Sequence, residues 1–269
     1  MTAVFMMMHI GMQGLSKRER KHMNAVYISV ENVNYSYEKT HPILKNITFT
    51  AKEHDCIGLI GANGVGKSTL LRLMVGLNLG YEGNICVGGI PVVKKNLSAI
   101  RKNIGYVFQD ADSQLFMSNV YEDLAFAPRN YGLSESEVEE RVKKVLEMVH
   151  IEHLKDKQIY KMSGGEKKLV SIATILTMMP DVILMDEPSV ALDPKNRRNL
   201  IHILNGFRQM KIIASHDLDM ILDTCSRVIL MSDGEIIRDG DVKDILFDKE
   251  LLEAHGLELP FCMQGVVFV

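Results

Sequence analysis

Residues 61 to 69 read Gly61-Ala62-Asn63-Gly64-Val65-Gly66-Lys67-Ser68-Thr69. An apolar run at 56–60 precedes this stretch and is typical of a buried strand, and the run at 70–75 favours a helix that ends at Gly76. The three glycines let the backbone wrap closely around a polyphosphate, because a Cβ there would clash or forbid the required dihedral angles. The freed N–H groups and the helix N-terminus then face negative charge. The motif and both flanks therefore predict a phosphate-binding loop.

Four side chains give this loop a predicted chemistry. Lys67 is long enough to reach the outer phosphates, and the hydroxyl of Ser68 is a ligand for Mg²⁺. Asp186 and Glu187 follow a second apolar run at 182–185. In a phosphate-loop enzyme such an aspartate holds Mg²⁺ directly or through water, and the adjacent glutamate polarises an attacking water. Two acids after an apolar strand are common by chance, but together with the Lys67 loop they are a strong signal.

Composition limits the classes of protein that the chain can belong to. Its 269 residues are 46% hydrophobic and 24% charged, as in ordinary soluble globular proteins. A net charge of −3 gives no reason to expect broad affinity for nucleic acid. The four cysteines form no C-x-x-C pair, which argues against a zinc site or a disulfide framework. No apolar run approaches the roughly 20 residues that span a bilayer, so another chain must supply any spans.

The N-terminal segment 1–25 differs from the rest of the chain. An apolar run at 4–8 precedes a basic run at 17–22, which is the reverse of the order in a secretory signal. We interpret the segment as a poorly ordered extension. A weak membrane-surface anchor and an upstream start codon, with the true start at Met23, are the alternatives.

The remaining pattern predicts an α/β fold. Alternating stretches at 27–30, 33–37 and 43–49 indicate strands, and further apolar strands are expected at 83–87, 104–108, 182–185 and 211–215. Residues 228–231 and 235–238 flank a turn and indicate a hairpin. A helix at 119–126, a capping box at 134–137 and a helix from Ser163 to Met179 predict a helical insert at about 110–180. Polar residues follow the C-termini of the predicted strands, and we expect the ligand-binding side chains to lie at that edge of the sheet.

The order of the polar residues resembles that of an ABC-type ATPase over about residues 26–245. The matching positions are Tyr37, residues 61–69, Gln109, Ser163-Gly164-Gly165-Glu166, Asp186-Glu187, residues 189–193 and His216. The resemblance implies a phosphate-loop NTPase cassette, with a RecA-like core, an antiparallel β subdomain and a helical subdomain. It also implies ATP and Mg²⁺ as cofactors. Residues 246–269 would form a C-terminal tail.

The resemblance further implies a role for each matched residue. Tyr37 would stack on adenine, and Gln109 would help to ligate Mg²⁺, sense the γ-phosphate and link to the transport partner. Glu187 would be the general base, and His216 would contact the γ-phosphate and hold the attacking water with Glu187. Asp193 would lie at the seam of a dimer. The predicted catalytic residues are Glu187, His216 and Lys67, the predicted Mg²⁺ ligands are Ser68, Gln109 and Asp186, and the predicted ATP contacts are Tyr37, residues 61–69, Gln109, residues 163–166 and Asp193.

The Ser-Gly-Gly segment implies a second chain. Ser163, Gly164 and Gly165 would form an anion-binding helix N-terminus. In the family this N-terminus caps the γ-phosphate held by the opposite chain, so that two cassettes sandwich two ATP molecules head to tail. The implied partner is a second ATPase chain, either a copy of this one or a close relative.

Some positions depart from the family pattern or allow a simpler interpretation. Met162 replaces the usual leucine, Glu166 replaces glutamine and so adds charge near a phosphate site, and Ala191 stands where glycine is frequent. Taken alone, Tyr37 is also consistent with a tyrosine packing on a neighbouring strand. His216 and Gln109, each taken alone, would be ordinary polar residues, and order and spacing favour the functional roles.

Two segments resemble one subgroup of the family, the ATPases of energy-coupling-factor and cobalt/nickel importers. These are the segment 108–116, with its Asp-x-Gln-Leu-Phe pattern, and the segment 251–260 near the end. The expected partners are a transmembrane coupling protein and a substrate-binding membrane component, at the cytoplasmic face of the cell membrane. The expected cargo is a transition-metal ion, cobalt or nickel, or else a vitamin. The rivals are an ATPase of another transporter class and a soluble ABC ATPase that remodels nucleic acid or ribosomes.

Overall fold

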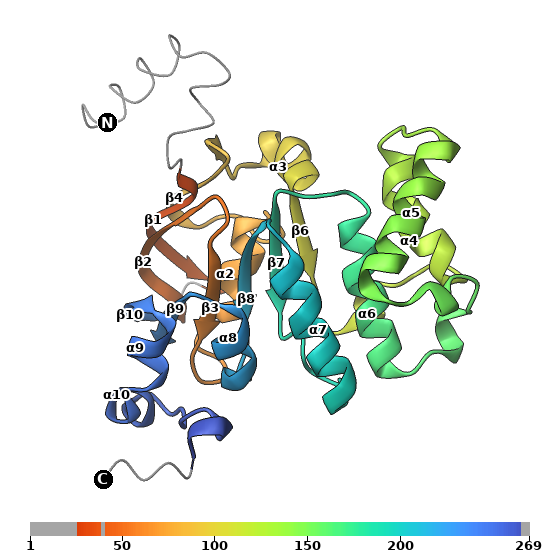
Figure 1. Ribbon diagram of the computed structural model, residues 1–269. Coiled ribbons are helices and arrows are strands. Elements are labelled where there is room, and N and C mark those ends of the chain that lie inside the picture. Colours follow the sequence, from red (N-terminus) through yellow and green to blue (C-terminus); the bar gives the residue numbers. More distant parts are fainter. Residues whose placement is uncertain (1–25, 39–40, 265–269) are drawn as a thin grey trace.

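The computed structural model describes residues 26–38 and 41–264 and contains two β-sheets (Figure 1). The expectations for residues 1–25 lie outside this part of the chain. The smaller sheet is antiparallel, has the strand order β2-β1-β4-β5 and corresponds to the predicted antiparallel β part. Its strands are β1 Val26–Ser36, β2 Pro42–Lys52, β4 Glu82–Val87 and β5 Ile90–Pro91.

The larger sheet has the strand order β10-β9-β3-β8-β7-β6 and is parallel from β9 to β6. Its strands are β3 Cys56–Ile60, β6 Ile104–Val107, β7 Val182–Asp186, β8 Met210–Ala214, β9 Arg227–Ser232 and β10 Glu235–Asp241. Strand β10 runs antiparallel to β9, so the hairpin expected there is confirmed. Strands β3, β7 and β8 are buried along their whole length, as central strands of a sheet covered on both faces must be.

The helical insert lies on one side of the larger sheet and the antiparallel sheet lies on the other (Figure 1). The insert contains α4 Val120–Asn130, α5 Glu135–Val149 and α6 Gly164–Leu176. The other helices are α2 Lys67–Met74, α3 Leu97–Asn103, α7 Pro194–Gly206, α8 Leu218–Thr224, α9 Val242–Leu246 and α10 Lys249–Ala254. Within residues 26–38 and 41–264, no helix is long and apolar enough to cross a membrane.

Strand β3 divides the hydrophobic interior into two cores because its side chains alternate between the faces of the sheet. Cys56 and Ile60 belong to the core that extends through the helical insert. Ile57 and Leu59 belong to the core that is shared with α2 and the antiparallel sheet. The strand that precedes the phosphate-binding loop is therefore fixed from both sides.

The structure corrects two of the predicted boundaries. The stretches 27–30 and 33–36 lie in one strand, β1, which is interrupted by a change of register where Asn32 has a φ of 49°, and Tyr37 follows the end of this strand. Helix α6 ends at Leu176 rather than at Met179, whose φ of 52° is incompatible with a right-handed helix. The capping box predicted for α5 is confirmed, since Ser134 and Glu137 exchange their side-chain and backbone hydrogen bonds.

Candidate functional site

The phosphate-binding loop connects β3 to α2 and is shaped by its glycines. Gly66 has a φ of 105°, and a Cβ at this position would approach Leu44 Cδ2 to 2.6 Å. Gly64 has a φ of 83°, which an L side chain rarely adopts. Among the described residues, no side chain caps the N-terminus of α2, so its first N–H groups are available to an anion.

Lys67 is the first residue of α2 and lies folded back over the loop. Its Nζ donates to the carbonyl of Gly61 at 2.6 Å and to that of Ala62 at 3.0 Å, and the residue is only 7% exposed. Burial lowers the pKa of Lys67, while the charges of Glu187 and Asp186 act to raise it. The ammonium is thus held at the loop in the field of two carboxylates.

Asp186 ends strand β7 and meets the first turn of α2. Ser68 Oγ donates to Asp186 Oδ1 at 2.8 Å, and the hydroxyl of Tyr106 donates to Asp186 Oδ2 at 3.1 Å. Asp186 is 1% exposed. Burial and the adjacent Asp186 charge raise the pKa of Tyr106, so the phenol remains a neutral donor. The structure brings together Ser68 and Asp186, two of the three predicted Mg²⁺ ligands.

Glu187 lies beside His216, as the resemblance implied. Glu187 Oε2 is 2.8 Å from His216 Nδ1 and accepts from the His216 backbone N–H and from Ser215 Oγ, both at 3.3 Å. The 2.8 Å contact requires the hydrogen on Nδ1. Glu187 has a φ of 47°, in the left-handed region, and its N–H donates to the carbonyl of Ala214. This carboxylate therefore has one oxygen held by donors and faces the same region as Lys67.

Gln109 follows β6 and is exposed, and its backbone is fixed by a residue that the sequence did not single out. Lys168 on α6 donates to the carbonyls of Phe108 at 2.9 Å and Gln109 at 2.8 Å. Lys168 is 2% exposed. Residues 168–173 of α6 are all buried, so no single apolar face marks Lys168 in the sequence.

Ser163 caps α6 in a capping box with Glu166. The Glu166 N–H donates to Ser163 Oγ at 3.3 Å, and the Ser163 N–H donates to Glu166 Oε2 at 2.8 Å. Lys157 donates to both Glu166 oxygens and lowers the pKa of this carboxyl. The additional charge of Glu166 is therefore paired with Lys157 within the same chain.

The segment that contains Asp193 packs beside α6. Asp193 caps α7 by accepting from Lys195 N at 2.8 Å and Asn196 N at 3.0 Å. Ala191 has a φ of 66°, which explains why glycine suits this position, and its Cβ would lie 3.8 Å from a Cβ added at Gly164. In the described part of the chain, no hydrogen bond links residues 163–166 to the phosphate-binding loop.

Tyr37 lies at the edge of the loop and is 56% exposed. Its hydroxyl accepts from Asn78 Nδ2 at 3.1 Å and is 3.3 Å from Thr69 Oγ1. The ring packs edge-to-face on Tyr35 with the centroids 5.1 Å apart. The hydroxyl end is therefore anchored beside α2, and much of the ring remains open to solvent.

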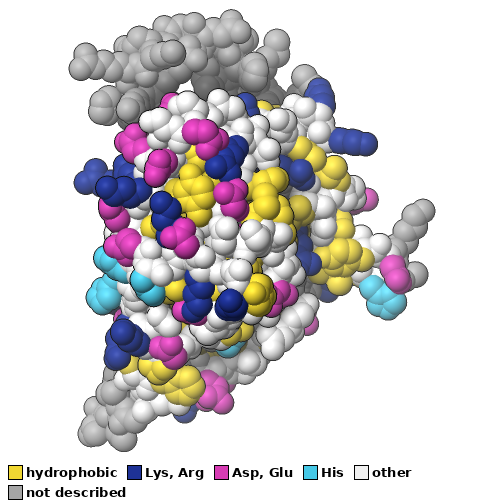
Figure 2. Space-filling view, turned by 90° about the vertical axis from the view of Figure 1, so that its right-hand side faces the viewer, with side chains coloured by type: hydrophobic (Ala, Val, Ile, Leu, Met, Phe, Trp, Pro, Cys, Tyr) yellow, Lys and Arg dark blue, Asp and Glu magenta, His cyan; other side chains and the backbone are white. Residues whose placement is uncertain are grey.

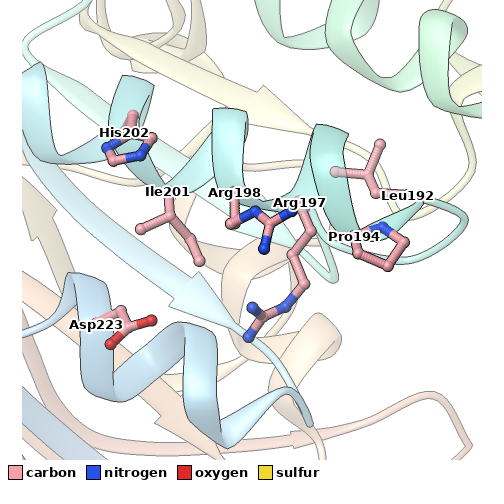
Figure 3. Close-up of a pocket in the computed structure, with 7 residues that line it drawn as sticks. All are labelled: Leu192, Pro194, Arg197, Arg198, Ile201, His202 and Asp223. Atoms are coloured by element: carbon pink, nitrogen blue, oxygen red, sulfur yellow. The ribbon is translucent and has the colours of Figure 1, made fainter.

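A separate cavity of about 460 Å³ lies between α7 and α8 (Figure 3). It is lined by Leu192, Pro194, Arg197, Arg198, Ile201, His202 and Asp223. Arg197 is already paired with Asp217 through two hydrogen bonds of 2.6 Å. The cavity contains none of the residues of the phosphate-binding loop, and we place the chemistry at the loop.

The chain matches a family model described as ABC transporter over residues 44–190. It is 43% identical to a Geobacter sulfurreducens protein assigned as an ABC transporter ATP-binding protein, over 88% of this chain and 96% of the relative. It is 38% identical to the energy-coupling factor transporter ATP-binding protein EcfA2 of Caldanaerobacter subterraneus, over 87% of this chain and 85% of the relative. The fold is similar to that of CbiO1 from Clostridium perfringens, which is part of the ABC transporter complex CbiONQ. The two structures match with a TM-score of 0.76 and 36% identity, over 85% of this chain and 94% of CbiO1.

The fold, the site and these similarities define the class of protein. The chain belongs to the family of ABC transporter ATP-binding proteins. It is an ATPase that couples ATP hydrolysis to transport, and its fold is that of the ABC ATPase cassette. Cassettes of this class work as dimers and with membrane components.

The burial of Lys168 predicts a characteristic pH dependence of stability. Burial lowers its pKa from 10.5 to about 8 in the folded protein. Between pH 8 and 10.5 the unfolded chain therefore binds more protons, and the contribution of Lys168 to stability rises with pH. Relative to Lys168→Met, the wild type should gain about 1–3 kcal/mol of unfolding free energy over this window. Denaturant titrations without nucleotide at several pH values measure this, and parallel pH profiles would contradict it.

Proposed function

We propose that the chain is the ATP-hydrolysing subunit of an energy-coupling-factor-type importer, with a transition-metal ion (cobalt or nickel) or a vitamin as cargo. The observation that carries this proposal is the construction of the segment that follows Gln109. Gln114 accepts from the Phe108 N–H at 3.2 Å and donates to the Ser171 carbonyl and to Thr174 Oγ1. Similarity to EcfA2 and CbiO1 supports the same subgroup.

The segment that follows Gln109 would present an apolar surface to a membrane partner. Asp112 pairs with Lys167 at 2.6 Å, which attaches the segment to α6. The buried carboxylate of Asp123 accepts from the N–H groups of Phe116 and Met117. Phe116 is 64% exposed and packs edge-to-face on Phe126. On the face formed by the helical insert, hydrophobic side chains emerge between charges of both signs (Figure 2). We assign this surface to a short helix of a transmembrane coupling protein, which would hold the cassette at the cytoplasmic side of the membrane.

The residues present fit a Mg²⁺ ion bound together with a nucleotide. Mg²⁺ prefers oxygen ligands and is usually held by one or two carboxylates and by substrate phosphates. Ser68 Oγ and Asp186 Oδ1 are adjacent at the loop, and Gln109 would be the third ligand. The described residues contain no group of three or more His, Cys, Asp and Glu able to hold a metal alone, which agrees with phosphates completing the site. When bound, Mg²⁺ neutralises charge on the phosphates.

Glu187 and His216 form the proposed hydrolytic pair. Because Glu187 Oε2 already accepts from Ser215 and from His216, Oε1 is the oxygen that we assign to the attacking water. Glu187 would accept a proton from this water as it attacks the γ-phosphorus. His216 Nδ1 orients the carboxylate. A contact of Nε2 with the γ-phosphate would require a hydrogen on both ring nitrogens, because phosphate oxygens only accept. Lys67 would hold the outer phosphates, and Tyr37 would stack on the base.

The site is completed by a second cassette in this proposal. The N-terminus of α6, at Ser163, Gly164 and Gly165, is a second anion site, and its own chain's loop does not use it. It would cap the γ-phosphate bound by the opposite chain, with Asp193 near the seam. ATP would close the pair and hydrolysis would reopen it. The rate of hydrolysis would then determine when the membrane partner moves. We assign residues 26–245 to the cassette and 246–269 to a tail.

Copurification tests the transporter class. A tagged chain isolated from its own host membrane in mild detergent should bring down a coupling protein and a small substrate-binding membrane protein, identified by mass spectrometry. Phe116→Asp should reduce this recovery about tenfold, because a charge would enter an apolar contact that is worth more than about 1.4 kcal/mol. Phe247→Asp, at a position in the tail where the phenylalanine is 44% exposed, is the control. Recovery of an exporter-type protein, or of ribosomes, would overturn the proposal.

Glu187→Gln tests the assignment of the general base. Hydrolysis should slow by roughly 10²-fold or more, while ATP affinity stays near that of the wild type. Lys67→Ala is the contrasting variant, because loss of the buried ammonium should weaken nucleotide binding itself. Phosphate release and titration with a fluorescent ATP analogue measure the two effects. Near-normal turnover of Glu187→Gln would remove Glu187 from this role.

A further inference from the structure

Tyr106 is a buried tyrosine that lies beside the metal-site carboxylate without belonging to the predicted site. It is 5% exposed and lies in β6, where it pairs with Leu184 of the parallel strand β7. Residues two apart on a strand point to the same face of the sheet. Asp186 therefore lies on the face of Leu184, which is also the face to which Tyr106 points. The two side chains meet in a hydrogen bond of 3.1 Å between the Tyr106 hydroxyl and Asp186 Oδ2.

This contact fixes the second oxygen of Asp186. Ser68 on α2 donates to Oδ1, and Tyr106 on β6 donates to Oδ2. A carboxylate whose two oxygens are held by donors from different elements has little freedom to rotate about its Cβ–Cγ bond. A ligand held in one orientation loses less entropy when the metal and the nucleotide bind.

Arg72 places a positive charge near the same phenols. It lies one turn after Ser68 on the same face of α2, and its charge acts to lower the pKa of Tyr106 and of Tyr37. Because a carboxylate only accepts, the Tyr106 hydroxyl is the donor in its hydrogen bond to Asp186.

We infer that Tyr106 is a positioning residue whose hydroxyl orients Asp186 for the metal and the nucleotide, an inference that rests on the proposed metal-binding role of Asp186. The ring of Tyr106 has a separate structural task, since it packs edge-to-face on Phe108 with the centroids 4.7 Å apart. Phenylalanine at this position keeps the ring and removes only the hydroxyl, so the two tasks can be separated by one substitution.

Tyr106→Phe is the test, with Tyr81→Phe as its matched control. Tyr81 is half-buried, and its hydroxyl donates to the carbonyl of Val92, away from the site. The readouts are Mn²⁺ affinity in the presence of ATP, measured by electron paramagnetic resonance, and the Mg²⁺ concentration for half-maximal hydrolysis. Tyr106→Phe should weaken metal binding about tenfold, the usual effect of removing a residue that orients a ligand. ATP affinity in EDTA and the melting temperature should change little, and Tyr81→Phe should behave as wild type.

Asp186→Asn separates the failure of this inference from the failure of the proposed site. Wild-type metal affinity in Tyr106→Phe, together with a large loss in Asp186→Asn, would overturn the role of Tyr106 alone. Wild-type metal affinity in Asp186→Asn would overturn the metal site itself. An equal loss of ATP affinity with and without metal in Tyr106→Phe would show a general structural effect and would also contradict the inference.

Discussion

The parallel direction of four neighbouring strands is the constraint on which the site depends. Strands β3, β8, β7 and β6 lie side by side, so their carboxyl ends meet at one edge of the sheet. The phosphate-binding loop follows β3, His216 follows β8, Glu187 follows β7 and Gln109 follows β6. Residues that are up to about 150 positions apart in the sequence are thereby brought to one edge of the sheet. Burial of these strands on both faces makes the arrangement rigid.

Local signals made much of this arrangement predictable from the sequence. The glycine-rich loop, the fully apolar strands, the capping box at Ser134 and the helix start at Ser163 each depend on neighbouring residues, and the structure contains them. The bend at Asn32 and the early end of α6 were missed because left-handed backbone at a non-glycine residue leaves little trace in a sequence.

The contacts that the sequence did not reveal join residues from different elements. Lys168 holds the backbone of Gln109 across 59 positions, and Tyr106 reaches Asp186 across 80. Neither contact follows from composition or period, because each depends on which strands and helices become neighbours. The Lys168 contact also joins the helical insert to the residues that follow β6, and the same helix, α6, begins at the Ser163 cap.

In the proposed arrangement one chain holds only part of the reactive site, and a second cassette would supply the rest. The most direct measurement is the mass of Glu187→Gln by light scattering, with and without Mg-ATP, at concentrations where nucleotide binding is verified. Closure of two cassettes around the nucleotide should give a mass of one chain without nucleotide and of two chains with Mg-ATP. A mass of one chain with Mg-ATP bound would contradict the pairing of two copies of this cassette around the nucleotide.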